Sequence, residues 1–189
     1  AGGHGAAGHA GAMTLRSTSI TKAGAAGAEA IVDTKVCDCC QTSAARTADG
    51  VIVAYRDRTE GEIRDIVVVR QVNGEWTEPT IVHEDGWHIE ACPVNGPAPS
   101  ARGRQAPVAW FTVKNDQGQA YAALSNDAGR TWGAPIRLDE GVSLGRVDIE
   151  VLDDGSAVAT WVEYADSRSQ LRMRRVEASG TRSDAVPVA

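Results

Sequence analysis

Three successive segments of the chain, each about 50 residues long, repeat one order of short apolar runs and turn residues. The aromatic residue in the central apolar run is Tyr55, then Trp110 after 55 residues and Trp161 after a further 51. Another tryptophan follows a tight turn at Trp76 and again at Trp132, and each is followed three residues later by a proline. A repeat of this length is typical of arrays whose units cannot bury both faces alone and therefore stack on their neighbours.

The apolar runs in these segments are short, and Gly, Asp or Asn residues separate them. Such residues accept the positive φ of tight hairpins, as at Asn73-Gly74 and Asp154-Gly155. Helical spacing is not sustained beyond two turns, so the pattern predicts strands. The clearest predicted strands are 50–58, 63–72, 107–113, 119–125, 156–163 and 170–176, with a preceding pair at 13–20 and 29–32 and further turns at 116–118 and 127–129.

These repeats predict an all-β fold, a partial β-propeller of about three and a half four-stranded antiparallel blades. A β-sandwich is the alternative, because it also consists of short strands but needs no repeat. A chain of 189 residues suffices for one such unit and is too short for two comfortable domains. The expected divisions are a low-complexity or linker segment at 1–12, a partial blade at 13–35, a blade with a cysteine-rich opening segment at 36–90, and blades at 91–140 and 141–189.

Charge and hydropathy argue against two classes of partner. The formal charge of −6 and the pI near 5.2 give no reason to expect nucleic acid, whose binders concentrate Lys and Arg on one face. The apolar runs are strand-sized, well below the ~20 residues of a membrane span, so no span is expected. The Gly-, Ala- and His-rich start has no signal-peptide pattern, and we expect a processed or truncated piece of a longer chain, with an expression remnant as the alternative.

The turn after the strand at 119–125 carries the pattern Ser-x-Asp-x-Gly-x-Thr-Trp. Ser and Asp side chains can cap turn amides, Gly accepts a left-handed conformation, and Trp can pack between blades. The motif resembles the Asp-box of bacterial sialidases and other Asp-box (BNR-repeat) propellers. Its residues are Ser125, Asp127, Gly129, Thr131 and Trp132.

Two cysteine-containing segments, 36–42 and 85–97, are similar to the paired Cys-x-Cys-Cys and Cys-Pro-Val-Asn-Gly-Pro motifs of uncharacterised exported sialidase-like proteins. The resemblance extends over nearly everything from Met13 onward. Those relatives are six-bladed rings, so it implies that further blades or another chain complete this one. It also implies a ligand at the central mouth, a carbohydrate by analogy, and a glycosidase of sialidase type as the activity to test. No arginine here matches the sialidase arginine triad by motif, so none is assigned to it.

The four cysteines form an even-numbered, clustered set, which indicates disulfides in an oxidising compartment, and hence a secreted or periplasmic location. In a propeller the segments that lead into innermost strands line the central mouth. Cys40 precedes one blade as Cys92 precedes the next, so we expect a Cys40–Cys92 disulfide, with Cys37 and Cys39 joined to each other or free. Closing a loop of about 50 residues would stabilise the fold by roughly 4 kcal/mol.

The alternative is a metal site made by the thiolates of Cys37, Cys39 and Cys40 with Cys92 or His88. Soft ligands of this kind suit copper(I) or zinc. The Cys-x-Cys-Cys spacing differs from the usual Cys-x-x-Cys, and exposed thiols of exported proteins oxidise. A disulfide-bonded protein without a metal is therefore the first expectation, and no other cofactor is indicated.

A glycosidase needs two carboxylates about 5 to 10 Å apart, one of them with a raised pKa. Asp38, Asp57 and Asp148 lie near the predicted blade mouth and are the candidates for catalysis. Alternating Arg and Asp at strand ends can instead form ion pairs that fix blade edges. The candidate ligand contacts are Arg56, Arg58, Arg64, Trp87, His88, Asn95 and Arg146, of which Trp87 could equally pack over the cysteines.

Four functions therefore remain open. They are a ligand-binding sialidase-like propeller, a glycoside hydrolase, a thiolate metal protein, and a structural or interaction module that completes a propeller with another chain. The remaining tryptophans recur at equivalent repeat positions, so we expect Trp76, Trp110, Trp132 and Trp161 in the contacts between blades.

Overall fold

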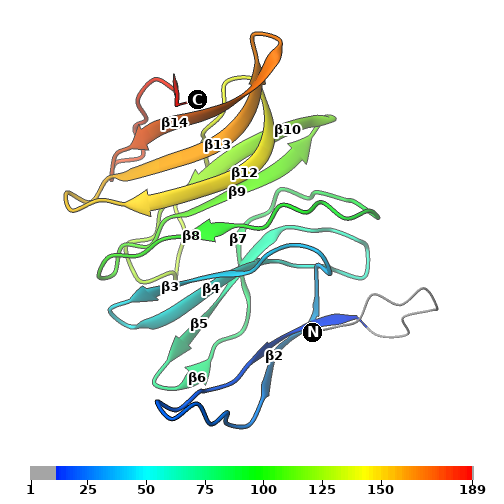
Figure 1. The fold of residues 1–189 in the computed structure, drawn as a ribbon, viewed down its shortest axis with the longest axis vertical. Helices are drawn as coiled ribbons and strands as arrows, with labels where there is room; N and C mark the ends of the chain where they lie inside the picture. The colour runs from blue at the N-terminus through cyan, green and yellow to red at the C-terminus, as the bar shows by residue number, and fades with distance from the viewer. Residues whose placement is uncertain (1–11, 189) are drawn as a thin grey trace.

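The computed structural model describes residues 12–188, in which every element is a β-strand and no α-helix occurs. The fifteen strands form four antiparallel sheets that follow one another along the chain (Figure 1). This confirms the predicted all-β class. The low-complexity segment at 1–12 lies, apart from its last residue, outside the described range.

The first sheet, here called the half-blade, pairs two strands, and three fuller blades follow it. Each blade is a meander in which successive strands are neighbours, except that the outer strand of the first blade is divided into two pieces that pair with the same inner strand. The half-blade contains β1 (Met13–Ser17) and β2 (Ala30–Val36), and the first blade contains β3 (Ser43–Thr47), β4 (Gly50–Arg56), β5 (Ile66–Val72), β6 (Glu75–Trp76) and β7 (Thr80–His83). The second blade contains β8 (Ala98–Pro99), β9 (Val108–Lys114), β10 (Gln117–Ala123) and β11 (Ile136–Arg137), and the third contains β12 (Val142–Val151), β13 (Ala157–Ala165), β14 (Arg168–Val176) and β15 (Val186–Pro187).

Successive sheets bury their faces against each other, as the stack of sheets in Figure 1 shows. Strand β9 illustrates why, because it is apolar on both sides. Val108 and Trp110 pack in the core shared with the first blade, whereas Ala109 and Phe111 pack in the core shared with the third. A third core joins the half-blade to the first blade. The chain is thus a partial propeller of stacked blades, as the repeat predicted.

The aromatic residues that define the repeat occupy equivalent places. Tyr55, Trp110 and Trp161 each lie on the second strand of their blade and belong to the core shared with the preceding sheet. Each also donates a hydrogen bond to a carboxylate, because a buried hydroxyl or indole N–H needs an acceptor. Tyr55 Oη donates to Asp33 at 2.5 Å, Trp110 Nε1 to Asp85 at 2.6 Å, and Trp161 Nε1 to Glu163 at 2.8 Å.

The hairpin predicted at Asn73-Gly74 has φ of 54° and 89°, as a tight two-residue turn requires. The turn predicted at 116–118 lies one residue earlier, because Asn115 and Asp116 take the positive φ values. Gly118 instead belongs to β10, where a Cβ would overlap the carbonyl oxygen of Ser143 in the third blade. That glycine therefore serves close packing between blades rather than the turn.

Several strand boundaries differ from the prediction. The strand expected at 63–72 begins at Ile66, because the preceding residues form the bend held by Thr59 N to Ile63 O. The innermost strands β3 and β12 were not among the clearly predicted ones. In β12, exposed and buried residues alternate along the whole strand, and no continuous apolar run marks it. The outer strand of the first blade is divided into β6 and β7, since Pro79 lies between them and has no amide hydrogen to donate to the ladder.

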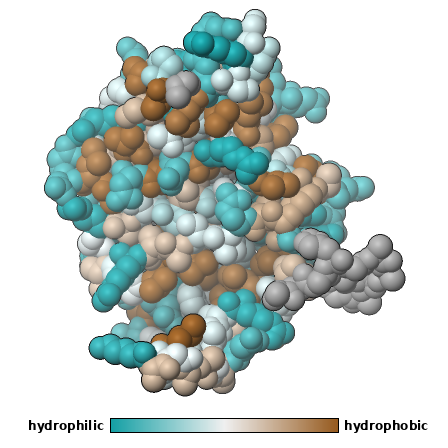
Figure 2. All heavy atoms as spheres, viewed as in Figure 1, coloured by the Kyte–Doolittle hydropathy of each residue, from teal (hydrophilic) through white to brown (hydrophobic). Residues whose placement is uncertain are grey.

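The face of the third blade that points away from the second exposes apolar side chains, and Figure 2 shows brown atoms gathered over this part of the molecule. A neighbouring blade or chain would cover such a face, so completion of the ring by another chain or by further blades stays a prediction. In the described range there is no helix able to cross a membrane. The exposed residues are Val142, Leu144, Tyr164, Leu171, Val186 and Val188.

Candidate functional site: a cysteine cluster at the blade ends

Three connecting segments meet at one end of the blades, which we call the cysteine end. They join β2 to β3 (37–42), β4 to β5 (57–65) and β7 to β8 (84–97). Backbone hydrogen bonds attach the first segment to the end of β4, from Cys37 N to Arg56 O at 3.0 Å, and the second segment to the third, from Arg64 N to Trp87 O at 2.9 Å. The Gln41 side chain accepts a further bond from Gly96 N at 2.9 Å, which fixes the first cysteine segment against the second.

The cysteine segments are joined by a disulfide between Cys39 and Cys92, whose Cα atoms lie 6.1 Å apart. The expected Cys40–Cys92 pairing is therefore wrong. The Gln41–Gly96 hydrogen bond sets the register of the two segments, and in that register Cys39 faces Cys92. Cys37 and Cys40 are both free, so they are joined neither to each other nor to Cys39.

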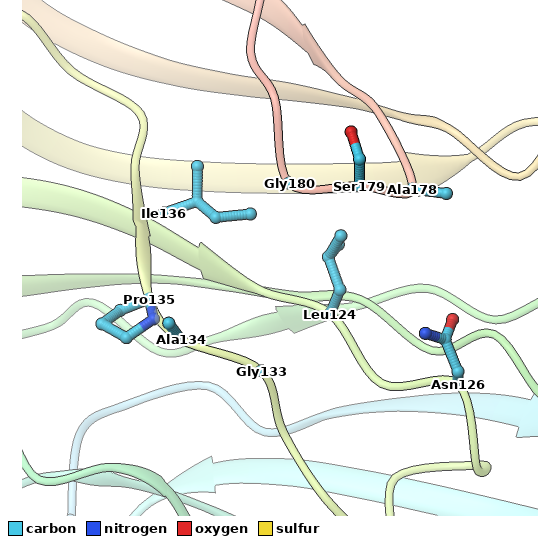
Figure 3. A pocket seen from close by; sticks show the side chains of 9 residues that line it. All are labelled: Leu124, Asn126, Gly133, Ala134, Pro135, Ile136, Ala178, Ser179 and Gly180. Carbon is cyan, nitrogen blue, oxygen red and sulfur yellow. The ribbon is translucent and has the colours of Figure 1, made fainter.

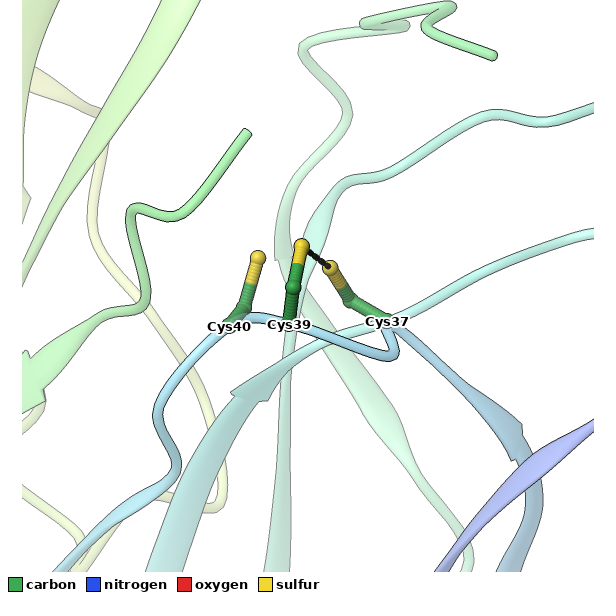
Figure 4. A group of neighbouring side chains, drawn as sticks. All are labelled: Cys37, Cys39 and Cys40. Atoms are coloured by element: carbon green, nitrogen blue, oxygen red, sulfur yellow. Dashed lines mark hydrogen bonds between the residues drawn. The ribbon is translucent and has the colours of Figure 1, made fainter. Parts of the chain in front are cut away.

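The sulfur atoms form a single cluster. The Sγ atoms of Cys37, Cys39 and Cys40 all lie within 4.8 Å of one another. Figure 4 shows the three side chains rising side by side from one short loop, with the Cys37–Cys39 contact of 3.9 Å drawn as a dashed line. Because Cys92 is bonded to Cys39, the sulfur atoms of all four cysteines converge on this place.

The two free thiols have opposite tendencies to ionise. The pKa of Cys37 falls to about 5, chiefly because the Cys40 thiol donates a hydrogen bond to it. Burial acts against this shift, while the Cys39 amide and the Arg64 guanidinium, whose Nη1 lies 3.4 Å from Cys37 Sγ, also favour the thiolate. The same hydrogen bond, with burial, raises the pKa of Cys40. Within this pair, Cys37 therefore ionises more easily than Cys40.

Arg56, at the end of β4, organises the floor beneath the cysteines and is only 1% exposed. Its guanidinium donates to the carbonyl oxygens of Asn95 at 2.9 Å, Arg64 at 2.6 Å and Phe111 at 2.6 Å. It also lies 4.8 Å from the ring centre of Trp87. Burial lowers its pKa, and the cysteines and nearby carboxylates partly offset this. Arg56 was predicted to contact a ligand, but its guanidinium forms hydrogen bonds within the protein instead.

Trp87, the strongest sequence candidate for a ligand contact, is buried and packs in the core between the second and third blades. Its ring meets Phe111 edge-on, with centroids 5.6 Å apart. Its amide donates to Asp65, which also accepts from Gly86 and so shapes the start of the second cysteine segment. Trp87 therefore packs in the core and is not exposed to a ligand.

Arg58 and Arg64 both bind the Glu62 carboxylate, at 2.9 and 2.8 Å, and Arg58 also binds Asp38 at 2.9 Å. The pKa of Glu62 falls to about 2, because Arg58 and then Arg64 donate hydrogen bonds to it. This network matches the alternative in which charges at strand ends fix blade edges. It also holds Arg64 in place against Cys37.

The three candidate catalytic carboxylates lie in different surroundings. Asp38 is exposed and paired with Arg58, whereas Asp148 is exposed in β12 and accepts a bond from the Ile149 amide. Asp57 is half-buried beside Val36, and burial raises its pKa, although the Arg58 amide acts in the opposite direction. Within residues 12–188 no hydrogen bond joins any two of these three side chains, and their catalytic role stays a prediction.

The other candidate ligand contacts connect blades or face solvent. The Asn95 side chain donates to Pro93 O at 3.0 Å and accepts from Arg146 N at 3.1 Å, so it links the second cysteine segment to the third blade. Arg146 has a φ of 55° at a break in the β12 pairing, and its side chain is exposed. His88 is exposed too, with its backbone bridged to Ile63.

The Ser125 turn lies apart from this site. Ser125 Oγ accepts from Gly129 N at 2.9 Å, and Asp127 accepts from the Thr131 amide and hydroxyl at 2.9 and 2.6 Å. Trp132 packs on the core between the first and second blades. The expected turn chemistry is present. The assignment to the Asp-box family stays a prediction.

Next to this turn, the second and third blades leave a cavity of about 360 Å³, shown in Figure 3. Leu124 and Ile136 point into it from the second blade, and the Ala178–Gly180 turn closes it from the third. None of the predicted site residues lines it.

No protein-family model and no curated protein matches the chain. Among solved structures, a Hadza microbial sialidase, Hz136, is 18% identical with a TM-score of 0.49, over 76% of this chain and 37% of that one. A Trypanosoma rangeli sialidase in complex with 2,3-difluorosialic acid, a covalent intermediate, is 12% identical with a TM-score of 0.49, over 93% of this chain and 36% of that one. The chain spans little more than a third of either sialidase. Its propeller architecture follows from the sheet order and the cores between blades described above.

The sequence predicted the two cysteine segments but not the residues that hold them in place. Nothing in the sequence marked Gln41 as the residue that sets the register, or Arg64 as the neighbour of Cys37. Val94 has a φ of 51°, which is rare for a β-branched residue, and it lies two residues after Cys92. The Asn95-Gly96 pair that follows was the available signal that this backbone is held in a special conformation.

Proposed function

We propose that the cysteine cluster is a thiolate site for one soft metal ion, copper(I) or zinc. The observation that carries the proposal is that the Sγ atoms of Cys37, Cys39 and Cys40 lie within 4.8 Å of one another. A zinc–thiolate bond is about 2.3 Å long, so two thiolates on one ion lie at most about 4.6 Å apart. The free cysteines therefore need only small side-chain movements to share an ion.

Reduction of the Cys39–Cys92 bond would supply four thiolates to one site, enough for tetrahedral zinc. Thiolates are soft ligands and select copper(I) and zinc over harder cations. Such an ion would link the two cysteine segments much as the disulfide does, and so would stabilise the cysteine end. His88 is the weaker candidate ligand, because it is exposed and does not belong to the sulfur cluster.

The protein's own residues suit a site that accumulates negative charge. Arg64 Nη1 lies 3.4 Å from Cys37 Sγ, and Glu62 holds the same guanidinium from the other side. Arg56 is fixed below the cluster by three backbone carbonyls. Two buried guanidinium groups would offset the charge of several thiolates, as groups around a metal's ligands commonly do.

The test is an anaerobic titration of the reduced chain with copper(I), and separately with zinc, against a chromophoric chelator. We expect one ion per chain, and we expect Cys37→Ser or Cys40→Ser to weaken binding by more than about 100-fold, because each removes a ligand. Thr42→Ala, in the same segment but without sulfur, is the matched control. Binding that is equally strong in both cysteine variants would overturn the proposal.

Carbohydrate binding or hydrolysis is the second candidate, and the setting of Asp57 favours it. A carboxyl whose pKa is raised by burial is the kind of group that serves as a general acid. Exposed Arg146 and His88 lie in or beside segments of the same end and could contact a sugar in an exported protein. Glycan arrays and hydrolysis assays should then show binding that Arg146→Ala weakens and turnover that Asp57→Asn lowers by at least about 100-fold. Unchanged turnover in Asp57→Asn would remove that residue from the mechanism.

A further inference from the structure

The free thiol of Cys37 lies beside a disulfide rather than beside another thiol alone. Its Sγ is 3.9 Å from Cys39 Sγ, which is bonded to Cys92. A disulfide bond is about 2.05 Å long, so an approach of about 2 Å would bring Cys37 into bonding distance. Cys37 itself is buried, whereas Cys92 is exposed.

The contacts of Cys37 hold its sulfur in position beside the disulfide. Arg64 Nη1 lies 3.4 Å from its Sγ, and the Arg64 side chain is held by Glu62 and is only 4% exposed. The backbone amide of Cys37 is fixed by Arg56 O at 3.0 Å. A thiol that lies beside a disulfide sulfur and next to a cation is an arrangement that favours thiol–disulfide exchange.

We propose that the metal-free, oxidised protein is a thiol–disulfide exchange centre, in which Cys37 attacks Cys39 and releases Cys92 as an exposed thiol. The Cys37 thiolate forms a bond to Cys39 Sγ, and the Cys39–Cys92 bond breaks. The electron pair of that bond leaves on Cys92, which takes up the proton that Cys37 gave up. No oxidant or reductant is consumed, because one disulfide and one thiol are present before and after.

The exchange gives the protein a second activity towards external disulfides. The released Cys92 thiol is at the surface, where it can attack a small disulfide such as oxidised glutathione. Cys92 then forms a mixed disulfide, and one molecule of reduced glutathione leaves. Exchange also breaks the covalent bond between the segment at 84–97 and the segment at 37–42, because that bond is the Cys39–Cys92 disulfide.

The test uses a Cys40→Ser variant, in which Cys37 is the one thiol left beside the disulfide. The metal-free protein is treated with chelator, incubated with iodoacetamide, quenched in acid and mapped by mass spectrometry without reduction. We expect label on Cys92 together with a Cys37–Cys39 disulfide peptide. With oxidised glutathione in place of iodoacetamide, the adduct should appear on Cys92.

The matched control is the Cys37→Ser, Cys40→Ser double variant, which keeps the disulfide but has no attacking thiol. Its Cys92 should be labelled at least about tenfold more slowly. Label confined to Cys37 in the single variant, or equal labelling of Cys92 in both variants, would overturn the proposal. Circular dichroism of each variant is the check that the fold is kept. Because no metal is present, the result is separate from that of the metal titration.

Discussion

At the scale of single residues, Arg56 carries the largest share of the hydrogen bonds beneath the cysteine cluster. It satisfies three carbonyl oxygens that belong to the first blade, the second blade and the second cysteine segment. Removing a buried donor leaves its acceptors unpaired, and a hydrogen bond to a charged group contributes about 1.5 to 3 kcal/mol. The residue therefore couples the site to the stability of the fold.

We expect Arg56→Met to lower the free energy of unfolding by about 3 kcal/mol or more. Urea denaturation followed by tryptophan fluorescence measures this change. Arg16→Met is the matched control, because Arg16 forms an exposed ion pair with Glu29 and should change stability by no more than about 1 kcal/mol. Equal losses in the two variants would contradict the role assigned to Arg56.

Asp127, in the Ser125 turn, gives a prediction for acid stability. Burial tends to raise its pKa, but hydrogen bonds from Thr131, Ser125 and the Arg130 amide together hold it at about 2, below the ordinary 3.8. A carboxyl depressed in the folded state stabilises the fold fully above its ordinary pKa, and this contribution is lost as the pH falls towards about 2.

Asp127→Asn should therefore reduce stability at pH 6 and flatten its dependence on pH between about 4 and 2. Urea denaturation at a series of pH values measures both effects. Asp116→Asn, at the exposed β9–β10 turn, should leave the slope in that window as it is in the parent protein. If Asp127→Asn kept the full slope, the hydrogen bonds of this turn would not be its cause.

At the scale of elements, the contact between the two cysteine segments depends on Gly96. A Cβ at this position would overlap the carbonyl oxygen and side chain of Gln41. We expect Gly96→Ala to separate the segments, to weaken metal binding by at least about tenfold and to lower stability by about 1 to 3 kcal/mol. Gly61→Ala, at the same end with room for a Cβ, should change neither quantity beyond error. Chelator competition and thermal unfolding are the measurements.

The strands show which elements a sequence can predict. Positive-φ residues such as Asn73 and Gly74 terminate strands whatever surrounds them, so the hairpins and the strands β4, β5, β9, β13 and β14 were predictable. Strand β12 carries a period-two pattern rather than an apolar run, because polar and apolar residues alternate from Arg146 to Val151. Strand β8 is two residues long, so it carries no local signal and its pairing is decided by the neighbouring strand.

At the scale of the whole molecule, the repeat determined the architecture, because a sheet that is apolar on both faces must be covered on both. The same repeat places both cysteine segments at the same end of adjacent blades, so their proximity was predictable. The partner of Cys92 was not, since the hydrogen bond from Gly96 to Gln41 sets the register between two irregular segments. Nor was the burial of Arg56, because an arginine beside Asp57 and Arg58 reads as a surface residue.

The stacking of adjacent blades thus brings the sulfurs of Cys37, Cys39 and Cys40 to the same end of the molecule as that of Cys92, which lies 53 residues after Cys39. X-ray absorption spectroscopy of the reduced, zinc- or copper-loaded protein tests this most directly, because it identifies the atoms bound to the metal. We predict sulfur neighbours alone, at about 2.3 Å for zinc, with loss of that signal in a Cys37→Ser, Cys40→Ser variant. Nitrogen and oxygen neighbours, or a sulfur signal unchanged in the variant, would contradict the account.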